Sequence, residues 1–213
     1  IARMDSDTMR SAEDYETVLE RFRRGELDIL VGTQMIAKGL HFPNVTLVGL
    51  INADLGLTMP DFRAQERTFQ LITQVAGRAG RGDIRGEVII QSRNPENDTI
   101  RFAVEQDFEG FSKFDLEFRE LLDYPPFTHL IAVHFRGEDE AATASFADRF
   151  TEELRRCAHD EIKFAGPAPA PIERIKTKYR YMLLIRGRRV AVLRRRLRQL
   201  VVHWEPPPGV GGY

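Results

Sequence analysis

The sequence predicts an α/β protein, made of a layered domain with a parallel sheet and a smaller α+β unit after it. Short apolar runs rich in Val, Ile and Leu, at residues 28–31 and 45–51, are typical of strands buried on both faces of a parallel sheet. Stretches with helical spacing alternate with these runs, as in layered α/β domains. Beyond residue 126 the expected order becomes βαββαβ, the split βαβ or ferredoxin-like pattern.

The first domain has elements that follow from periodicity and from residues that start or stop helices. Gly25 is a plausible stop for the first helix, while Asp61 is the expected N-cap and Gly80 the expected terminator of the second. The expected elements are a strand end at 1–7, a helix at 11–25, strands at 28–31 and 45–51, a helix at 61–79 and a strand at 86–91. This domain is expected to span residues 1–97.

A helical connector is expected at residues 98–126, because helical spacing over 99–122 is stopped by the prolines at 125 and 126. The α+β domain then fills residues 127–213. Its expected elements are strands at 129–135, 162–165 and 179–185, helices at 138–158 and 190–199, and a last strand that begins at 201–204. The segment from Gly166 to Pro171 is interpreted as a stiff link with a structural role only.

Composition limits the class of protein. The 213 residues suit one or two domains, and 42% hydrophobic with 30% charged residues is typical of a soluble globular chain. No apolar run approaches the roughly 20 residues of a membrane span, and the first residues lack a signal-peptide pattern. One cysteine, Cys157, excludes an internal disulfide framework and a multi-thiolate zinc site. We therefore expect no membrane partner, no metal site in this segment, and a cytoplasmic location.

Charge is distributed unevenly. Residues 172–204 hold eleven Lys and Arg against one acid, a local net charge of +10, so the rest of the chain carries −11 at an overall −1. A basic block on an acidic body favours an anionic partner, with nucleic acid preferred over a merely solvated face.

The segment Gln74-Val-Ala-Gly-Arg78-Ala-Gly-Arg81 carries the strongest functional signal. Arg78 and Arg81 suit phosphate oxygens, and Gly77 and Gly80 allow the backbone to approach a ligand closely. In a nucleotide-driven motor they would stabilise charge on a γ-phosphate, with Gln74 bonding the phosphate or the attacking water. The alternative is a surface helix end whose cations face the negative end of the dipole.

A second polar run, residues 33–39, directly follows the strand expected at 28–31. Open α/β sheets bind ligands at the carboxyl ends of their strands. Thr33, Gln34 and Lys38 are donors that suit the phosphates of a DNA strand, and Gly39 allows close approach. The alternative is an ordinary loop between a strand and a helix.

Two further charged groups are ambiguous. On a strand, alternation would place Lys176, Lys178 and Arg180 on the face opposite to Tyr179 and Tyr181. Cations beside aromatic rings suit single-stranded nucleic acid, but the tyrosines could equally face the core.

Asp54 and the charges at residues 61–67 form either an ion-pair network within the domain or part of a functional site. Helical spacing places Arg63 and Arg67 on one face with Glu66 adjacent, which suits ion pairing. The two interpretations are evenly balanced.

Several segments together resemble the PriA-type primosomal helicases, over nearly the whole chain. They are Ile29-Leu-Val-Gly-Thr-Gln-Met-Ile-Ala-Lys-Gly39, Pro60-Asp-Phe-Arg-Ala-Gln-Glu-Arg-Thr-Phe-Gln-Leu71, the 74–81 motif, Asp123-Tyr-Pro-Pro-Phe127, Gly166-Pro-Ala-Pro-Ala-Pro171 and Lys178-Tyr-Arg-Tyr181. The resemblance implies an ATP-dependent 3′→5′ DNA helicase of superfamily 2 that acts in replication restart. It also implies a RecA-like lobe at residues 1–97 and a C-terminal domain that contacts forked or single-stranded DNA and single-strand-binding protein.

The chain departs from the complete helicase pattern. It contains no G-x-x-x-x-G-K-[ST] phosphate loop and no Asp-Glu-x-His motif, and Asn52 stands where the family is expected to have an aspartate. ATP with Mg²⁺ would be bound mainly by another lobe, and the family's zinc would lie outside this segment. We expect a C-terminal fragment that is inactive by itself. A DNA- and protein-binding module with degenerate motifs is the alternative.

Overall fold

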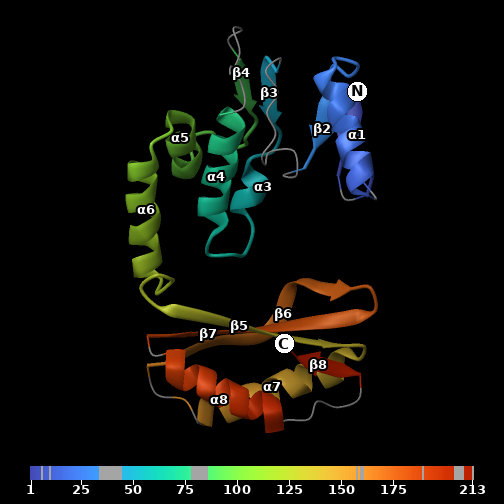
Figure 1. Cartoon of the computed structure of the whole chain (residues 1–213). Coiled ribbons are helices and arrows are strands. Elements are labelled where there is room, and N and C mark those ends of the chain that lie inside the picture. Colours follow the sequence, from blue (N-terminus) through green and yellow to red (C-terminus); the bar gives the residue numbers. More distant parts are fainter. Residues whose placement is uncertain are drawn as a thin grey trace. The chain divides into compact units, whose positions relative to one another are not determined.

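The computed structural model describes residues 1–5, 7–9, 11–33, 45–77, 86–156, 158, 161–188, 190–203 and 209–212. The chain divides into two compact units, Ile1–Asp115 and Leu116–Tyr213 (Figure 1). The mixed helices and strands confirm the α/β class. The domain boundaries at residues 97 and 126 remain predictions.

The first unit contains two pairs of parallel strands. β1 (Ala2–Met4) pairs with β2 (Leu30–Gly32), and β3 (Leu47–Leu50) pairs with β4 (Glu87–Ile90), with Leu47 opposite Glu87. The parallel pairing confirms the expectation from the sequence.

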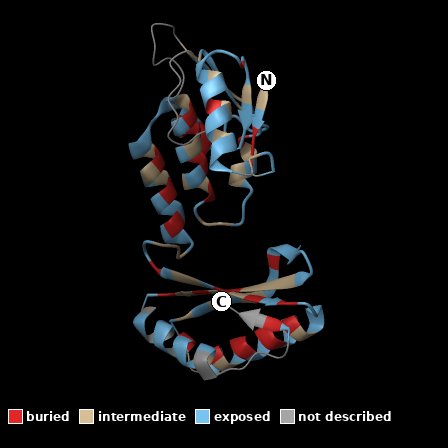
Figure 2. Ribbon diagram, turned by 45° about the vertical axis from the view of Figure 1, so that its right-hand side comes forward, coloured by how far each residue is buried: buried red, intermediate tan, exposed pale blue. Residues whose placement is uncertain are grey.

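The expected burial of these strands on both faces is wrong. Along β3 and β4, exposed and half-buried residues alternate, and Leu47 and Ile89 are 57% and 53% exposed. Leu50 and Ile90 instead pack against a buried cluster that includes Ile72. The described helices therefore cover one face of this strand pair, and the apolar side chains of the other face remain accessible (Figure 2).

Helices of the first unit are set by local capping. They are α1 (Ala12–Arg23), α3 (Asp54–Leu57), α4 (Ala64–Ala76), α5 (Asp98–Glu105) and α6 (Phe108–Leu121), the last of which continues into the second unit. At α1, Ser11 and Asp14 form a reciprocal capping box, and Gly25 follows the helix with a φ of 74°.

The N-cap predicted for α4 is wrong. Arg63 is the N-cap and makes no side-chain capping bond, whereas the Asp61 carboxylate accepts a hydrogen bond from the Arg63 N–H at 2.9 Å. Asp61 thus stabilises the turn before the helix, a common role of Asp in turns.

The helical connection expected at residues 99–122 consists of two helices. Gln106 ends α5 in the left-handed region, with a φ of 57°, and the Asp107 carboxylate accepts a hydrogen bond from the Gly110 N–H at 2.8 Å. Phe111 of α6 stacks on Phe69 of α4, with ring centroids 4.2 Å apart, and both rings are buried. This contact ties the connector helices to the first unit.

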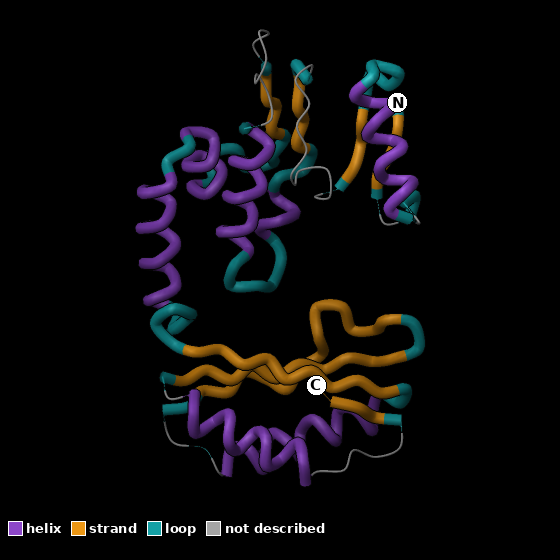
Figure 3. Tube along the Cα trace, viewed as in Figure 1, coloured by secondary structure: helices purple, strands orange, loops and turns teal. Residues whose placement is uncertain are grey.

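In the second unit a four-stranded antiparallel sheet has the order β6-β7-β5-β8. Its elements are β5 (His129–Gly137), α7 (Glu140–Arg156), β6 (Lys163–Ile175), β7 (Lys178–Gly187), α8 (Val190–His203) and β8 (Val210–Gly212). Both helices lie on the same face of the sheet (Figure 3). Phe135, Phe150 and Leu183 form part of the core between them.

The last strand was predicted in the wrong place. Residues 201–203 continue α8, and the strand β8 lies at 210–212. Leu197 and Leu200 contact the core three residues apart, which is helical spacing, whereas Val201 is exposed on the same helix.

The proline-rich segment is part of a strand, not a link. β6 is longer than expected, and within it Ala168 pairs with Met182 and Pro169 with Tyr181 of β7, beside irregular register shifts. β6 lies at one edge of the sheet, where proline is tolerated because that side needs no N–H donors.

Candidate nucleotide and nucleic-acid sites

The described part of the glutamine-arginine motif lies where the sequence predicts, at the C-terminal end of a helix. Gln74 is exposed in the last turn of α4, while Ile72 and Val75 are buried and fix that face toward the core. Gly77 is the C-cap, and its N–H donates to the Thr73 carbonyl at 3.0 Å. Gln74 is therefore exposed at this helix end.

Three members of this motif, Arg78, Gly80 and Arg81, lie outside the described residues. Their predicted roles remain predictions.

Thr33 is exposed and directly follows β2, as expected for a residue at the carboxyl end of a parallel strand. Gln34, Lys38 and Gly39 lie outside the described residues. Among the hydrogen bonds of the described residues, none joins Thr33 to Gln74.

Residues 174–181 form a hairpin, which corrects the single alternating strand expected for Lys176, Lys178 and Arg180. Ile175 pairs with Lys178, and Lys176 lies in the turn between β6 and β7 with a φ of 56°. Lys176 and Lys178 are exposed near the hairpin tip. The turn thus separates Lys176 from the strand that carries the other two cations.

On β7 the alternation holds. Tyr181 packs against the core, so Arg180 points to the opposite face, which neither of the described helices α7 and α8 covers (Figure 3). The Arg174 guanidinium lies over the Tyr179 ring, 4.9 Å from the ring centroid. For Tyr181, the core-facing alternative is confirmed.

A histidine and an arginine that sequence reasoning missed extend this face. On β5, Arg136 lies opposite Arg180 and His134 opposite Met182. Burial and then the charges of Arg180 and Arg136 lower the pKa of His134, so its imidazole is neutral at pH 7. Alternation against the buried Val133 and Phe135 would have identified both residues.

The charges at residues 61–67 form an ion-pair network within the unit. The Asp61 carboxylate lies 3.5 Å from the Arg63 Nε and 3.0 Å from an Arg67 guanidinium nitrogen. Partial burial opposes ionisation of Asp61, but the Arg63 N–H and the charges of Arg67 and Arg63 outweigh it and lower its pKa. This favours the structural interpretation for Asp61.

Asp54 is not part of that network. Its carboxylate accepts hydrogen bonds from the Arg93 N–H at 2.8 Å and the Ser92 hydroxyl at 2.9 Å. These bonds join the start of α3 to the segment after β4, and they lower the pKa of Asp54. Nearby, Asn52 has a φ of 56°, a region that asparagine enters more readily than most residues.

No cluster of three or more His, Cys, Asp or Glu within the described ranges is arranged to hold a metal ion. In the same ranges, no helix combines the length and apolar character that crossing a membrane requires.

Comparison with known families gives the class of protein. Residues 1–83 match the helicase conserved C-terminal domain, and residues 120–206 match the primosomal protein N C-terminal domain. The α/β fold and the first of these matches define a helicase-type C-terminal region.

Whole-chain similarity identifies the family. The chain is 42% identical over 205 residues, 96% of its length, to "Replication restart protein PriA" of Bacillus subtilis (strain 168). It is 42% identical over 92% of its length to the protein of that name from Chlamydia muridarum, and 41% identical over 99% to that from Treponema pallidum. The chain belongs to the PriA family. It covers 26%, 26% and 32% of these relatives, respectively.

Proposed function

We propose that the chain is part of an ATP-dependent 3′→5′ DNA helicase of superfamily 2 that acts in replication restart and primosome assembly at stalled forks. The observation that carries this proposal is the similarity to "Replication restart protein PriA" along 96% of the chain. The two domain matches follow one another in the same chain, which supports a helicase lobe joined to a primosomal domain.

In this proposal the first unit is a RecA-like lobe that completes a nucleotide site. Gln74, Arg78 and Arg81 stabilise the charge on the γ-phosphate of ATP, which is bound with Mg²⁺ mainly by another lobe. The exposure of Gln74 and the helix end at Gly77 support this role. Gly77 and Gly80 allow the backbone to approach the phosphates closely.

DNA contacts come from both units. Thr33, Gln34 and Lys38 bind the DNA backbone, with Gly39 allowing close approach, and the exposed position of Thr33 after β2 supports this. In the second unit, Lys176, Lys178 and Arg180 bind forked or single-stranded DNA.

We also propose that the second unit is ferredoxin-like. Its element order βαββαβ and its strand order β6-β7-β5-β8 support that assignment. Single-strand-binding protein and other primosome proteins are the proposed partners, in the cytoplasm.

Arg81→Ala, made in a full-length protein that contains this chain, tests the nucleotide role. Removal of an arginine finger costs about 10³–10⁵ in rate where it has been measured, so ATP hydrolysis should be nearly abolished. The measurement is steady-state ATPase activity with saturating forked DNA, with circular dichroism to verify folding.

Arg101→Ala is the matched control, since Arg101 pairs on the surface with Asp98 and lies outside the motif. It should retain normal turnover. Normal turnover by Arg81→Ala would eliminate the arginine-finger role.

A non-enzymatic DNA- and protein-binding module is the second candidate. It is favoured by one observation, the lack of a G-x-x-x-x-G-K-[ST] phosphate loop in these 213 residues. The full-length protein discriminates the two candidates, because a module would bind DNA without hydrolysing ATP. The 213-residue chain alone should not hydrolyse ATP in either case.

A further inference from the structure

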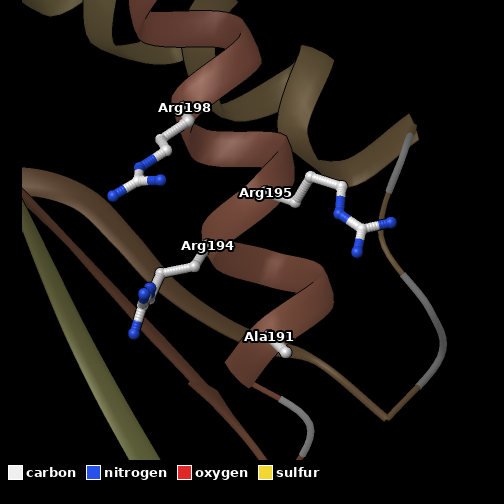
Figure 4. Close-up of a pocket in the computed structure, with 4 residues that line it drawn as sticks. All are labelled: Ala191, Arg194, Arg195 and Arg198. Atoms are coloured by element: carbon white, nitrogen blue, oxygen red, sulfur yellow. The ribbon is translucent and has the colours of Figure 1, made fainter.

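Helix α8 carries an arginine surface on its exposed side. Arg194, Arg195 and Arg198, with Ala191, line a cavity of about 420 Å³. Arg194 and Arg198 are four residues apart and therefore lie on the same side of the helix, while Arg195 lies three residues from Arg198. Figure 4 shows Arg194 and Arg198 projecting in the same direction, one turn apart, while Arg195 projects to the other side of the helix in this view. We refer to these three residues as the α8 arginine surface.

These arginines carry charge that the described residues do not neutralise. All three are exposed, and within the described ranges none lies in an ion pair with a carboxylate. Residues 190–203 contain no Asp or Glu at all. Like charges four residues apart destabilise a helix, so the Arg194–Arg198 pair is unfavourable for folding alone.

The arginines at the end of helix α1 differ, because each lies close to a glutamate. On α1, Arg21 lies 3.3 Å from Glu26, and Arg23 and Arg24 lie 3.1 Å and 3.7 Å from Glu20. The α8 arginine surface is instead held by a helix whose Leu197 is buried in the core. A fixed, unneutralised cationic surface is what an anionic partner requires.

We propose that the α8 arginine surface binds the phosphodiester backbone of nucleic acid without reading its sequence. Arg194 and Arg198 are four residues apart, which corresponds to a rise of about 6 Å along the helix. Over that length one strand of a duplex presents about two phosphates, at about 3.4 Å per nucleotide. Each guanidinium can bond two oxygens of one phosphate.

Nucleic acid fits this surface better than an acidic peptide does. Peptide and protein partners are usually anchored by apolar or aromatic side chains in well-packed pockets. Among the described residues, those that line the cavity are one alanine and three arginines, with no aromatic side chain.

The α8 arginine surface is distinct from the hairpin that carries Lys176 and Lys178. Helices α7 and α8 lie on one face of the sheet, whereas Arg180 points to the other face. The second unit can therefore contact two separate stretches of nucleic-acid backbone. This inference rests on the proposed DNA binding by this chain.

The test is DNA binding by the 213-residue chain over a salt series, measured by fluorescence anisotropy with a labelled duplex that has a single-stranded tail. In the variant Arg194→Gln/Arg195→Gln/Arg198→Gln, the slope of log affinity against log salt should become shallower by about 2–3, one unit for each lost phosphate contact. The Arg→Lys version at the same positions should keep most of that slope.

A matched control removes the same charge elsewhere. Arg21→Gln/Arg23→Gln/Arg24→Gln should leave the slope unchanged, because those arginines are already paired. Circular dichroism should show that every variant is folded.

The outcomes separate this inference from the proposed function. If Lys176→Gln/Lys178→Gln weakens binding but the α8 variant does not, the α8 inference is wrong and the proposed DNA contact stands. If the unmodified chain binds no DNA, both are wrong. Loss of binding to labelled polyglutamate in the α8 variant, with DNA affinity unchanged, would instead assign the surface to an acidic protein.

Discussion

At the scale of single residues, Asp54 shows how one carboxylate joins segments that are distant in sequence. It accepts hydrogen bonds from Ser92 and from the Arg93 N–H, 38 and 39 residues further along the chain. Charge-assisted bonds of this kind are stronger than neutral ones. They also favour the ionised carboxylate and lower the pKa of Asp54.

This pKa makes a pH-dependent contribution to stability. Because the pKa of Asp54 is lower in the folded state than the ordinary value of about 3.9, ionised Asp54 stabilises the fold above that value, and the contribution is lost as pH falls through the folded-state pKa. Asp54→Asn should therefore lower the urea midpoint at pH 7, and the difference from wild type should shrink at pH 3. Glu96→Gln, on the neighbouring exposed loop, is the control. A difference that stays constant with pH would contradict the linkage.

Gly137 is required by close contacts within the second unit. A Cβ added there would lie 2.2 Å from the Thr143 Oγ1 and 2.9 Å from the Val210 Cγ2. Thr143 is fully buried and donates to the Asp139 carbonyl, so it cannot move freely.

Gly137→Ala should cost about 1–3 kcal/mol of unfolding free energy, measured by urea denaturation, as expected for overpacking. Gly49→Ala is the control, because a Cβ at Gly49 meets nothing within 4 Å. It should be neutral or stabilise by about 0.5–1 kcal/mol. Equal effects of the two substitutions would refute the steric account.

At the scale of elements, the β6–β7 hairpin combines a strained turn with exposed cations. Lys176 has a φ of 56°, and the left-handed region costs a non-glycine residue roughly 1–2 kcal/mol. Glycine at this position would remove that cost, but its greater conformational entropy would stabilise the unfolded chain by about 0.4–1 kcal/mol. The loss of backbone strain is the larger of the two effects, so the substitution should stabilise the folded state.

Lys176→Gly should thus raise the unfolding free energy by about 0.5–1 kcal/mol in urea denaturation. Lys176→Gln removes the same charge but keeps the strain, and should leave stability near that of wild type. If both substitutions stabilise equally, the gain comes from charge and the strain argument fails.

Elements with strong local signals were predicted closely from sequence. α1 begins after the Ser11 cap and ends near Gly25, as its apolar spacing and glycine stop indicate. Elements that depend on distant partners were predicted less closely. The strand character of residues 166–171 comes from pairing with β7, and the hairpin turn at Lys176 comes from the register between β6 and β7.

The candidate sites show the same difference between local signals and contacts with distant partners. Gln74 was placed correctly at a helix end because helical periodicity is local information. The grouping of Arg136 with Arg180 required the strand register of the sheet, which the sequence does not contain explicitly.

At the scale of the whole molecule, the two units have separate hydrophobic cores. Phe111 belongs to the buried cluster of the first unit and Phe150 to that of the second. Separate cores predict two unfolding transitions instead of one.

Phe111→Ala and Phe150→Ala should each cost about 3–5 kcal/mol, but in different transitions. Differential scanning calorimetry of the 213-residue chain should show one transition shifted by each substitution and the other unchanged. A single transition that both substitutions shift equally would show that the units unfold together.

The position of β6 at the edge of its sheet has a consequence for self-association. Prolines at 167, 169 and 171 lie within this edge strand. None of the three has an N–H to donate, and the pairing of β6 with β7 is irregular around them, with register shifts between Ala165 and Ala168 and between Pro169 and Arg174. An incoming strand from a second molecule finds no regular ladder to extend, so the prolines protect the open edge against polymerisation at high protein concentration.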